Sequence, residues 1–519
     1  MAIRNPIIPG FHPDPSICRV GDDYYIVNST FEWFPGVPVH HSKDLENWKL
    51  IGHILTRPDQ LDLRGVPDSG GVWAPSLSHA DGKFWLIYTN LRNTGLGRPF
   101  KDIKIYLTTA DDILGPWSEP VELNSIGFDP SLFHDEDGRK WLVNMMWDFR
   151  KDHPRFAGIV LQEYDHATGK LVGPMTNILA KPVLTEGPNL YKRDGWYYLM
   201  LAEGGTGWNH GISMARSRSL AGPYELDPQT SVMTTRDDYG HPLQKAGHGE
   251  LVETPAGEWY LAHLASRPVS PERRCILGRE TCLQRVIWSE DGWLRLAHGG
   301  HHPQTELSDT SSLPGFRDDF TTQNLDPSWS SLRVPVDGSW LSLSARPGWL
   351  RLTGRDSLHS FFEQSLVAQR LQHFDVTAQT CLEFAPDHFT QMAGLVCYYH
   401  TRMHYYLRVT HDEALGKVVG IVLTDNGNYD ELRASQLAVN DWKEIHLRAR
   451  INRERLRFSA SPDGMTWQNV GPVLDASKLS DDYAQGFTGA MIGLCAQDLG
   501  GTRRHADFGY FQLTSQPSI

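Results

Sequence analysis

One stretch near the N-terminus reads Phe11-His12-Pro13-Asp14-Pro15-Ser16 and is soon followed by Asp23-Tyr24-Tyr25-Ile26. It is the first copy of a repeated pattern: a turn with Pro or Gly, an apolar strand, a polar turn and an aromatic strand. Later copies begin at Ala74-Pro75-Ser76, Asp129-Pro130-Ser131, Gly187-Pro188-Asn189 and His248-Gly249-Glu250. Counted from Pro15 through the equivalent Pro or Gly positions, the spacings are 60, 55, 58 and 61 residues. So steady a period of strand-type residues predicts a five-bladed β-propeller.

The innermost strand of each propeller blade lines a central channel, so equivalent residues of distant repeats meet there. The repeats bring Asp14, Ala74 beside Trp73, Asp129, Glu186 just ahead of Gly187, and His248. Three carboxylates, a histidine and an indole at one mouth predict acid/base chemistry on a polar, ring-shaped substrate.

The repeat fades after about residue 300, and a chain of 519 residues is long enough for two domains. Residues 298–316 (HGGHHPQTELSDTSSLPGF) have the Gly-, Ser-, Thr- and Pro-rich composition of a linker. Beyond them, alternating strands without repeats predict a two-sheet β-sandwich, a lectin-like jelly roll. We therefore expect an all-β chain with a propeller over 1–303, a linker over 304–316 and a sandwich over 317–519.

The composition of the chain limits the kinds of molecule that it is expected to bind. The formal net charge is −13 and no basic run is present, which disfavours nucleic acid and anionic membranes. The start of the chain lacks the apolar segment of a secretory signal, and no window reaches membrane-spanning length. The six cysteines show no C-x-x-C pair, so we expect buried free thiols and a cytoplasmic location. The 17 Trp, 18 Tyr and 20 Phe suit the binding of sugar rings.

Two carboxylates of unequal pKa can protonate a glycosidic oxygen and promote attack at the sugar carbon. We choose Asp14, whose flanking prolines fix its backbone, and Glu186 as this pair. Asp129 lies between them in blade order and is expected to raise the pKa of Glu186 by like-charge repulsion. Taken singly, each carboxylate is also explained as a turn residue at the start of a strand. Weaker rivals are Glu203, Glu250 and Glu253.

Other side chains near the predicted channel are candidates for holding a sugar: Phe31, Trp73, Thr206, Trp208, His248 and Arg279. The aromatic ones are equally well explained by packing, and Arg285 competes with Arg279 as a substrate clamp. His248, set between glycines, could hold water or a single cation such as Ca²⁺, although no second ligand is evident. We predict no metal-ligand set and no required cofactor.

These residues resemble those of glycoside hydrolase family 43, specifically its two-domain β-xylosidases. The resemblance rests on the motifs at 5–16, 29–36, 71–75, 128–131, 185–188, 246–249 and 277–281. In the C-terminal part it rests on Gly486-Phe487-Thr488-Gly489-Ala490 and Ala506-Asp507-Phe508. Together these motifs extend over essentially the whole chain.

The resemblance implies exo-hydrolysis, with inversion, of β-1,4-xylo-oligosaccharides from the non-reducing end, with α-L-arabinofuranosides as additional substrates. It implies that Asp14 is the general base, Glu186 the general acid, and Asp129 the residue that positions the acid. Arg279 matches an arginine that contacts the terminal sugar, and Phe487 matches an aromatic residue delivered from the second domain. We expect a cytoplasmic homo-oligomer that trims xylo-oligosaccharides to xylose.

Two other functions stay open at this point. One is an enzyme that is primarily an α-L-arabinofuranosidase, and the other is a non-catalytic carbohydrate-binding propeller similar to a lectin. The presence of all three carboxylates argues against the lectin, because binding alone needs no acid and base across a bond. Phe487 has the alternative of being a core residue of the sandwich.

Overall fold

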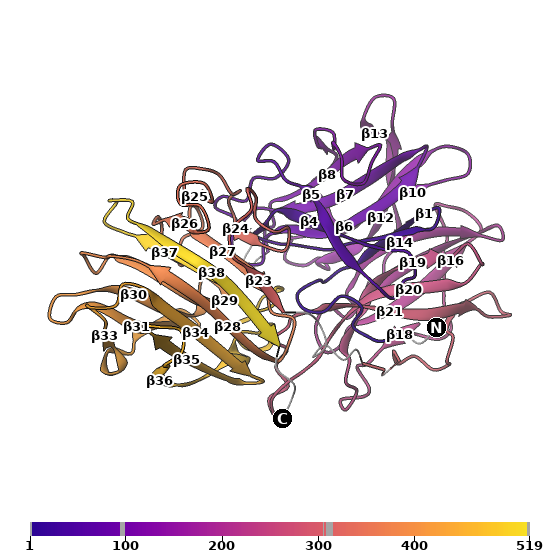
Figure 1. The fold of residues 1–519 in the computed structure, drawn as a ribbon. Coiled ribbons are helices and arrows are strands. Elements are labelled where there is room, and N and C mark those ends of the chain that lie inside the picture. Colours follow the sequence, from indigo (N-terminus) through magenta and orange to yellow (C-terminus); the bar gives the residue numbers. More distant parts are fainter. Residues whose placement is uncertain (1–2, 94–98, 305, 308–314, 516–519) are drawn as a thin grey trace.

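The computed structural model describes residues 3–93, 99–304, 306–307 and 315–515 and consists almost wholly of β-strands. In Figure 1 the propeller (indigo to magenta) lies beside the sandwich (orange to yellow). The predicted fold class, a five-bladed β-propeller followed by a β-sandwich, is confirmed. Most of the predicted linker over 304–316 lies outside the described residues.

Each blade is an antiparallel sheet whose strands follow one another in the order of the chain. Blade one contains β1 (Ser16–Val20), β2 (Asp23–Val27), β4 (Gly36–Ser42) and β5 (Lys49–Leu55). Blade two contains β6 (Gly71–Ala80), β7 (Lys83–Leu91), β8 (Ile103–Ala110) and β9 (Val121–Glu122). Blade three contains β10 (Gly127–His134), β11 (Lys140–Trp147), β12 (Phe156–Asp165) and β13 (Lys170–Leu179).

Blade four contains β14 (Thr185–Arg193), β15 (Trp196–Glu203), β16 (Gly211–Ser217) and β17 (Glu225–Leu226), with β18 (Met233–Thr234) also pairing with β16. Blade five contains β19 (Gln244–Glu253), β20 (Trp259–Ser266), β21 (Glu280–Trp288) and β22 (Leu294–Leu296). Every repeat found in the sequence is thus the first hairpin of one blade.

The sandwich consists of two sheets that pack face to face around an apolar core. One sheet contains β23 (Phe316–Asp318), β25 (Leu341–Ser342), β26 (Leu350–Thr353), β28 (Asp375–Glu383), β34 (Ile445–Asn452), β35 (Arg455–Ser461), β36 (Gln468–Asp475) and β38 (His505–Ser515). The other contains β3 (Trp33–Phe34), β24 (Ser330–Leu332), β27 (Ser365–Arg370), β29 (Gln391–His400), β30 (Met403–Asp412), β31 (Gly416–Asp425), β32 (Asn428–Glu431), β33 (Leu437–Ala438) and β37 (Met491–Asp498). The short helices within the described residues are η2 (Arg433–Ser435), η3 (Ala476–Lys478) and α1 (Asp481–Ala484).

The N-terminal segment closes the ring of blades without a covalent link. The buried side chain of Asn5 donates a hydrogen bond to the carbonyl of Leu283 at 3.0 Å and accepts one from its amide at 2.8 Å. The amides of Ile7 and Ile8 donate to the carbonyl of Thr281. Residues that precede blade one are therefore fastened to β21 of blade five.

A backbone irregularity recurs at the predicted turns of the innermost strands. The dihedral angle φ is positive at Asp14 (51°), Ala74 (34°), Asp129 (52°), Gly187 (56°) and His248 (38°). The pairing register shifts at this point in β6, β10, β14 and β19. All five residues line one small hollow on the channel axis. The left-handed backbone therefore directs one residue of each blade toward the channel, although it costs a residue with a Cβ roughly 1–2 kcal/mol.

The two domains are joined by β-pairing and by buried charges. The two-residue strand β3 leaves blade one and pairs with β24 of the sandwich. The side chain of Arg333 is fully buried and donates to the carbonyl of Val66 at 2.7 Å and to Asp68 at 2.9 Å. Breaking a buried pair of this kind typically costs 3–5 kcal/mol, so the sandwich has a defined position on the propeller.

The six cysteines are all buried and unpaired, as expected. Among the described residues, no helix has the length and apolar character needed to cross a membrane. The cytoplasmic location and the homo-oligomeric state stay predictions.

Replacing the glycine of the fourth bulge tests how tightly the channel is packed. A Cβ at Gly187 would lie 2.9 Å from Nε2 of His248, whereas a Cβ at Gly138, which also has positive φ, would meet nothing within 4 Å. We expect Gly138→Ala to lose about 1 kcal/mol of unfolding free energy and Gly187→Ala to lose more, because His248 must move. Denaturant unfolding followed by circular dichroism measures both. Equal losses would show that His248 accommodates the methyl group freely.

Candidate active site

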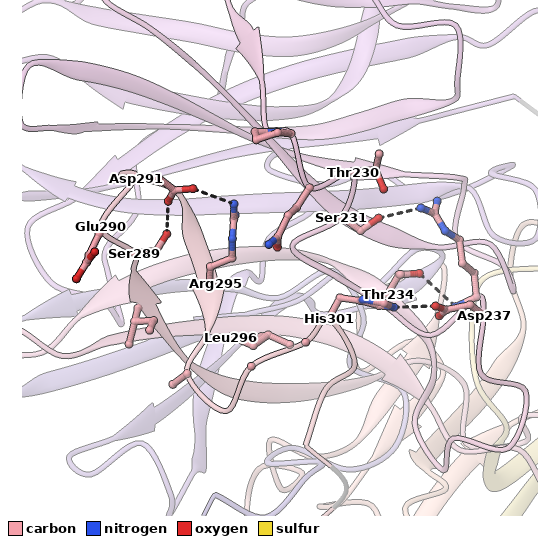
Figure 2. Close-up of a pocket in the computed structure, with 17 residues that line it drawn as sticks. Thr230, Ser231, Thr234, Asp237, Ser289, Glu290, Asp291, Arg295, Leu296 and His301 are labelled. Atoms are coloured by element: carbon pink, nitrogen blue, oxygen red, sulfur yellow. Dashed lines mark hydrogen bonds and ion pairs between the residues drawn. The ribbon is translucent and has the colours of Figure 1, made fainter.

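The predicted carboxylates meet in a small pocket at one mouth of the channel. Its volume is about 60 Å³, well below the 300–1,000 Å³ of common ligand pockets. It is lined by Asp14, Phe31, Trp73, Ala74, Phe128, Asp129, Glu186, Thr206, His248, Arg279 and Phe487. A much larger hollow of about 1050 Å³ on the same domain has no Phe, Tyr or Trp in its lining (Figure 2). The convergence of acids and aromatic rings, rather than volume, therefore marks the functional site.

The pocket is built from two successive rings of residues. The first is the left-handed ring described above, which includes Asp14 and Asp129. The second ring consists of the residues immediately before these in the chain, and of its members Trp73, Phe128 and Glu186 line the pocket. Glu186 is therefore the counterpart of Trp73 and not of Asp14, in agreement with its place just ahead of Gly187 in the repeat. The offset of one residue places Glu186 in a different layer from Asp14.

Asp14 is held as a carboxylate by three partners. Ser29 Oγ donates to its Oδ2 at 2.6 Å, Arg279 Nη1 donates to its Oδ1 at 2.9 Å, and His248 Nδ1 lies 3.7 Å from Oδ1. Burial alone would raise the pKa of Asp14, but the charges of Arg279 and His248 and the Ser29 hydrogen bond outweigh it and lower the pKa. Asp14 is thus ionised at neutral pH, as a general base requires.

Ser29 was not singled out by the sequence analysis as a site residue. Its hydroxyl accepts a hydrogen bond from the amide of Ala74 at 2.7 Å while donating to Asp14. The hydroxyl therefore links blade two to the carboxylate of blade one and orients that carboxylate with its Oδ1 toward Arg279. Its place beside Phe31 in the motif at 29–36 was the available signal.

The pKa of Glu186 is raised, whereas that of Asp14 is lowered. Burial in the pocket, followed by repulsion from Asp14, raises its pKa to about 7, although the charges of Arg279 and Lys101 act against this. A glutamic acid with this pKa carries a proton through the acidic range and up to neutral pH. It can therefore donate a proton where Asp14 cannot.

Asp129 lies next to Glu186 and contacts its backbone neighbour. Asp129 Oδ2 accepts a hydrogen bond from the amide of Gly187 at 3.2 Å. Burial, repulsion from Glu186 and repulsion from Asp14 raise the pKa of Asp129 well above its usual value. Asp129 therefore holds the peptide that follows Glu186. The repulsion that raises the pKa of Glu186 comes from Asp14, and an effect of Asp129 on that pKa stays a prediction.

Arg279 connects the base to the second domain. Besides Asp14, it donates to Thr206 Oγ1 at 2.8 Å and to the carbonyl of Phe487 at 3.1 Å. The competing candidate Arg285 is more than half exposed and pairs with Glu258. Of the two arginines, Arg279 is the one that lines the pocket.

Aromatic rings form the pocket wall. Phe487 is contributed by the sandwich and lies 5.9 Å from Phe31 and 5.4 Å from Trp73 between ring centroids. Phe128 contacts Trp73 at 5.4 Å. Ser69 Oγ accepts a hydrogen bond from the amide of Phe487 at 2.9 Å, which holds this residue against the propeller. Phe487 therefore lines the pocket and is only partly buried, rather than a core residue of the sandwich.

Lys101 was missed by the sequence analysis. Its ammonium lies 4.8 Å from the ring centre of Trp147 and 5.3 Å from that of Trp73. Burial lowers its pKa to about 8, and the charge of Glu186 acts against this shift. Lys101 stands in an irregular connection between β7 and β8, outside the repeat, so no pattern in the sequence could have identified it.

Other predicted residues lie elsewhere. Trp208 does not line the pocket and packs against the charges of Lys245 and Arg273. Among the rival acids, Glu203 pairs with Lys181, and Glu250 accepts a hydrogen bond from the amide of Ile17 at 3.0 Å. Glu253 is exposed. The role of Trp208 as a sugar contact stays a prediction.

Comparison with known proteins gives consistent matches over the whole chain. The profile of glycosyl hydrolases family 43 matches residues 3–294, and that of the beta xylosidase C-terminal concanavalin A-like domain matches residues 317–514. The chain is 46% identical to xylosidase/arabinosidase 43B of Humicola insolens, with 98% of this chain and 97% of the relative covered. It is 44% identical to a xylan 1,3-beta-xylosidase of a Vibrio species, with 98% of each covered.

A solved structure also matches this chain over nearly its whole length. The crystal structure of xylan beta-1,4-xylosidase from Bacillus halodurans C-125 superimposes with a TM-score of 0.95 at 53% sequence identity. The match covers 99% of this chain and 100% of the other. The propeller and the sandwich therefore occur together, in the same arrangement, in that protein.

Replacing Asp129 by Asn separates its two effects on Glu186. Asn keeps an oxygen that can accept the Gly187 hydrogen bond but cannot ionise, so the negative charge that Asp129 gains when it loses its proton is absent beside Glu186. We expect Glu186 to lose its proton at a lower pH than in the unmodified protein, because like-charge repulsion is reduced. Titration of ¹³C-labelled glutamate side chains by NMR measures this, with Glu186→Gln identifying the resonance. An unchanged titration would restrict Asp129 to a positioning role.

Proposed function

This chain belongs to glycosyl hydrolases family 43, and we propose that it is an exo-acting, inverting β-xylosidase that releases xylose from non-reducing ends of β-1,4-xylo-oligosaccharides. One observation carries the proposal: within the same small pocket the partners of Asp14 lower its pKa, whereas burial raises the pKa of Glu186 to about 7. The names of the Humicola insolens and Bacillus halodurans relatives support the choice of xylose.

The proposal gives each carboxylate one part of the reaction. Asp14 accepts a proton from a water molecule, which attacks the anomeric carbon of the terminal sugar. Glu186 gives its proton to the glycosidic oxygen, so the leaving sugar departs as a neutral alcohol. Water must fit between Asp14 and the sugar, and attack from that face inverts the anomeric configuration. Afterwards Asp14 holds a proton and Glu186 lacks one, and exchange with solvent restores both.

The pocket shape supports removal of one terminal sugar at a time. Phe31, Trp73 and Phe487 enclose a space suited to one ring, and Arg279 closes the side nearest Asp14. Lys101 lies beside Trp73 and Trp147 without lining this space. We place the leaving sugar on the Lys101 side, where Glu186 protonates the bond between the two units.

Two variations of substrate are supported by the relatives' names. The Humicola insolens protein is named xylosidase/arabinosidase, so an α-L-arabinofuranosidase side activity belongs to the proposal. The Vibrio protein is named xylan 1,3-beta-xylosidase, so β-1,3-linked xylosides are a second candidate. The linkage depends on the Lys101 side of the pocket, because the terminal ring is the same in both.

The proposed reaction uses only carboxylates and water, so it requires no cofactor. A cation near His248 would be shared with Asp14 and Glu250, which line the same channel hollow. Carboxylate oxygens suit Ca²⁺, whereas the imidazole does not, and Asp14 is already paired with Arg279. We therefore favour water at this position. Homo-oligomeric assembly also stays a prediction, to be tested by light scattering.

Early products of hydrolysis test the proposed function directly. With β-1,4-xylobiose, proton NMR in the first minutes should show α-xylose before mutarotation, because water attacks from the face opposite the leaving sugar. We expect slower release from β-1,3-xylobiose and from an aryl α-L-arabinofuranoside. Initial β-xylose, or release from the arabinofuranoside alone, would contradict the proposal.

Leaving-group dependence separates the roles of the two acids. Glu186→Gln should lose about 10²- to 10⁴-fold in kcat on xylobiose but keep much of the activity on aryl xylosides, whose leaving groups need little protonation. Asp14→Asn should impair both substrates, because activation of water is needed in each case. Steady-state kinetics on both substrates measures this. Equal losses for Glu186→Gln would remove Glu186 from the role of acid.

A further inference from the structure

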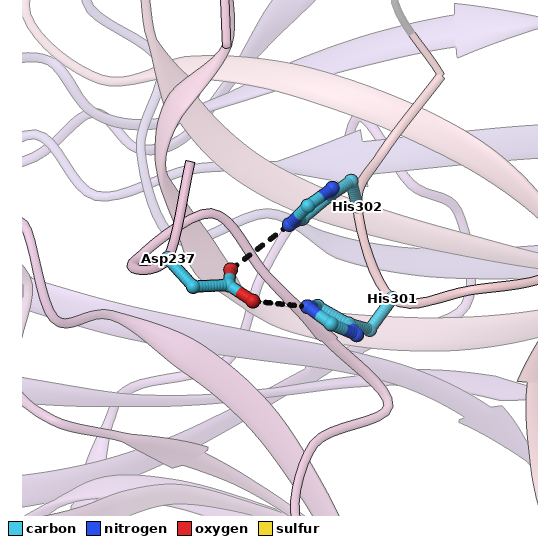
Figure 3. Close-up of side chains that lie close together, drawn as sticks. All are labelled: Asp237, His301 and His302. Atoms are coloured by element: carbon cyan, nitrogen blue, oxygen red, sulfur yellow. Dashed lines mark hydrogen bonds and ion pairs between the residues drawn. The ribbon is translucent and has the colours of Figure 1, made fainter. Parts of the chain in front are cut away.

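Three potential metal ligands converge on the propeller surface, outside the catalytic pocket. Asp237 lies in the connection between β18 and β19, and His301 and His302 follow β22. Figure 3 shows the carboxylate of Asp237 between the two imidazoles. His301 Nε2 is 2.8 Å from one carboxylate oxygen and His302 Nε2 is 2.9 Å from the other. The three ligand atoms lie within 4.8 Å of one another.

We propose that Asp237, His301 and His302 bind one divalent transition-metal ion, with Zn²⁺ as the preferred ion. Two imidazoles and a carboxylate suit Zn²⁺, whereas Ca²⁺ and Mg²⁺ prefer oxygen ligands alone. Zinc bonds of 2.0–2.1 Å place tetrahedral ligand atoms roughly 3.3 Å apart. Ligand atoms already within 4.8 Å reach this arrangement by small rotations of their side chains.

The backbone of the histidine pair is fixed independently of their side chains. The carbonyl of His301 accepts a hydrogen bond from the amide of Thr234 at 2.9 Å. The carbonyl of His302 lies 2.9 Å from His298 Nε2, and that of Pro303 lies 3.0 Å from His241 Nε2. These contacts hold the segment in place and leave both imidazoles free to bind an ion.

Charge also favours a cation at this position. The guanidinium of Arg236, the preceding residue, donates to Ser231 Oγ at 2.9 Å. Among the residues that the structure describes, the ion pairs recorded for Asp237 are both with histidines. A neutral imidazole can carry its hydrogen on Nδ1 and present the lone pair of Nε2 to an ion. The carboxylate then supplies the negative charge that balances a divalent ion.

The position of the site indicates what the ion would do. Asp237 and His301 are 64 residues apart in sequence and both line the hollow of about 1050 Å³ (Figure 2). Water from the hollow can complete the coordination. The ion would connect the outer loop of blade four to the segment that leaves blade five, and a link across so long a loop stabilises the folded state.

Zinc binding by the full-length protein tests this proposal. Equilibrium dialysis against Zn²⁺ should show one ion per chain that is lost in the triple variant Asp237→Asn, His301→Gln, His302→Gln. Zinc should raise the melting temperature of the unmodified chain and not that of the variant. Co²⁺ should give visible absorption bands of a histidine-ligated ion in the unmodified chain alone. Activity of the metal-free variant on xylobiose should be unchanged.

Two matched controls separate this site from others. Cys381, Glu444 and His446 form another cluster of potential ligands in the sandwich, so Cys381→Ser should retain the ion. His153→Gln removes a surface histidine paired with Asp148 and should retain it too. If the triple variant does not fold, the single variant His302→Gln tests zinc binding instead. It should fold, because the contacts that hold this segment use backbone carbonyl oxygens and not the His302 side chain. Zinc binding by the triple variant equal to that of the unmodified chain, or no saturable ion in the unmodified chain up to about 1 mM zinc, would overturn the proposal.

Discussion

The left-handed backbone at the start of each blade is the constraint on which the rest of the site depends. In a regular strand the side chains alternate between the two faces of the sheet and none is directed along the channel. The left-handed backbone at Asp14, Asp129 and the equivalent positions breaks this alternation, so that Trp73, Phe128 and Glu186, each just before such a position, also line the pocket. The same strained backbone conformation occurs once in each of the five blades, and together these positions create a site that no single blade could form.

Electrostatics then gives the two carboxylates different protonation states. Arg279 and Ser29 lie against Asp14, so its charge is compensated where it is buried. Glu186 has no such hydrogen-bonded cation among the described residues, and burial with nearby Asp14 keeps it protonated. The low-dielectric pocket strengthens both effects, because attraction to Arg279 and repulsion between carboxylates are weakly screened there.

The fold and the three carboxylates could be predicted because they belong to the repeat. Asp14, Asp129 and Glu186 recur with the Pro-containing turn, and this places them at the channel without any knowledge of contacts. Residues outside the repeat could not be found in this way: Lys101 comes from an irregular connection, and its distance to Trp147 depends on how two blades pack. Trp208 shows the converse case. Its position in the sequence suggested a place near the channel, whereas its ring packs against Arg273 and does not line the pocket.

The sandwich is part of the acid/base machinery although it supplies no acid or base. Phe487 covers the pocket, and its carbonyl accepts a hydrogen bond from the same Arg279 that pairs with Asp14. Lys245 of blade five pairs with Asp481 and Asp482, so the loop that carries Phe487 is held to the propeller by buried charges. Without this cover, water would screen Asp14 from Glu186 and hydrate both, and the pKa values would return toward those of free carboxylic acids. The docking of the second domain therefore contributes to the raised pKa of Glu186, which gives the sandwich a part in a pocket whose carboxylates all come from the propeller.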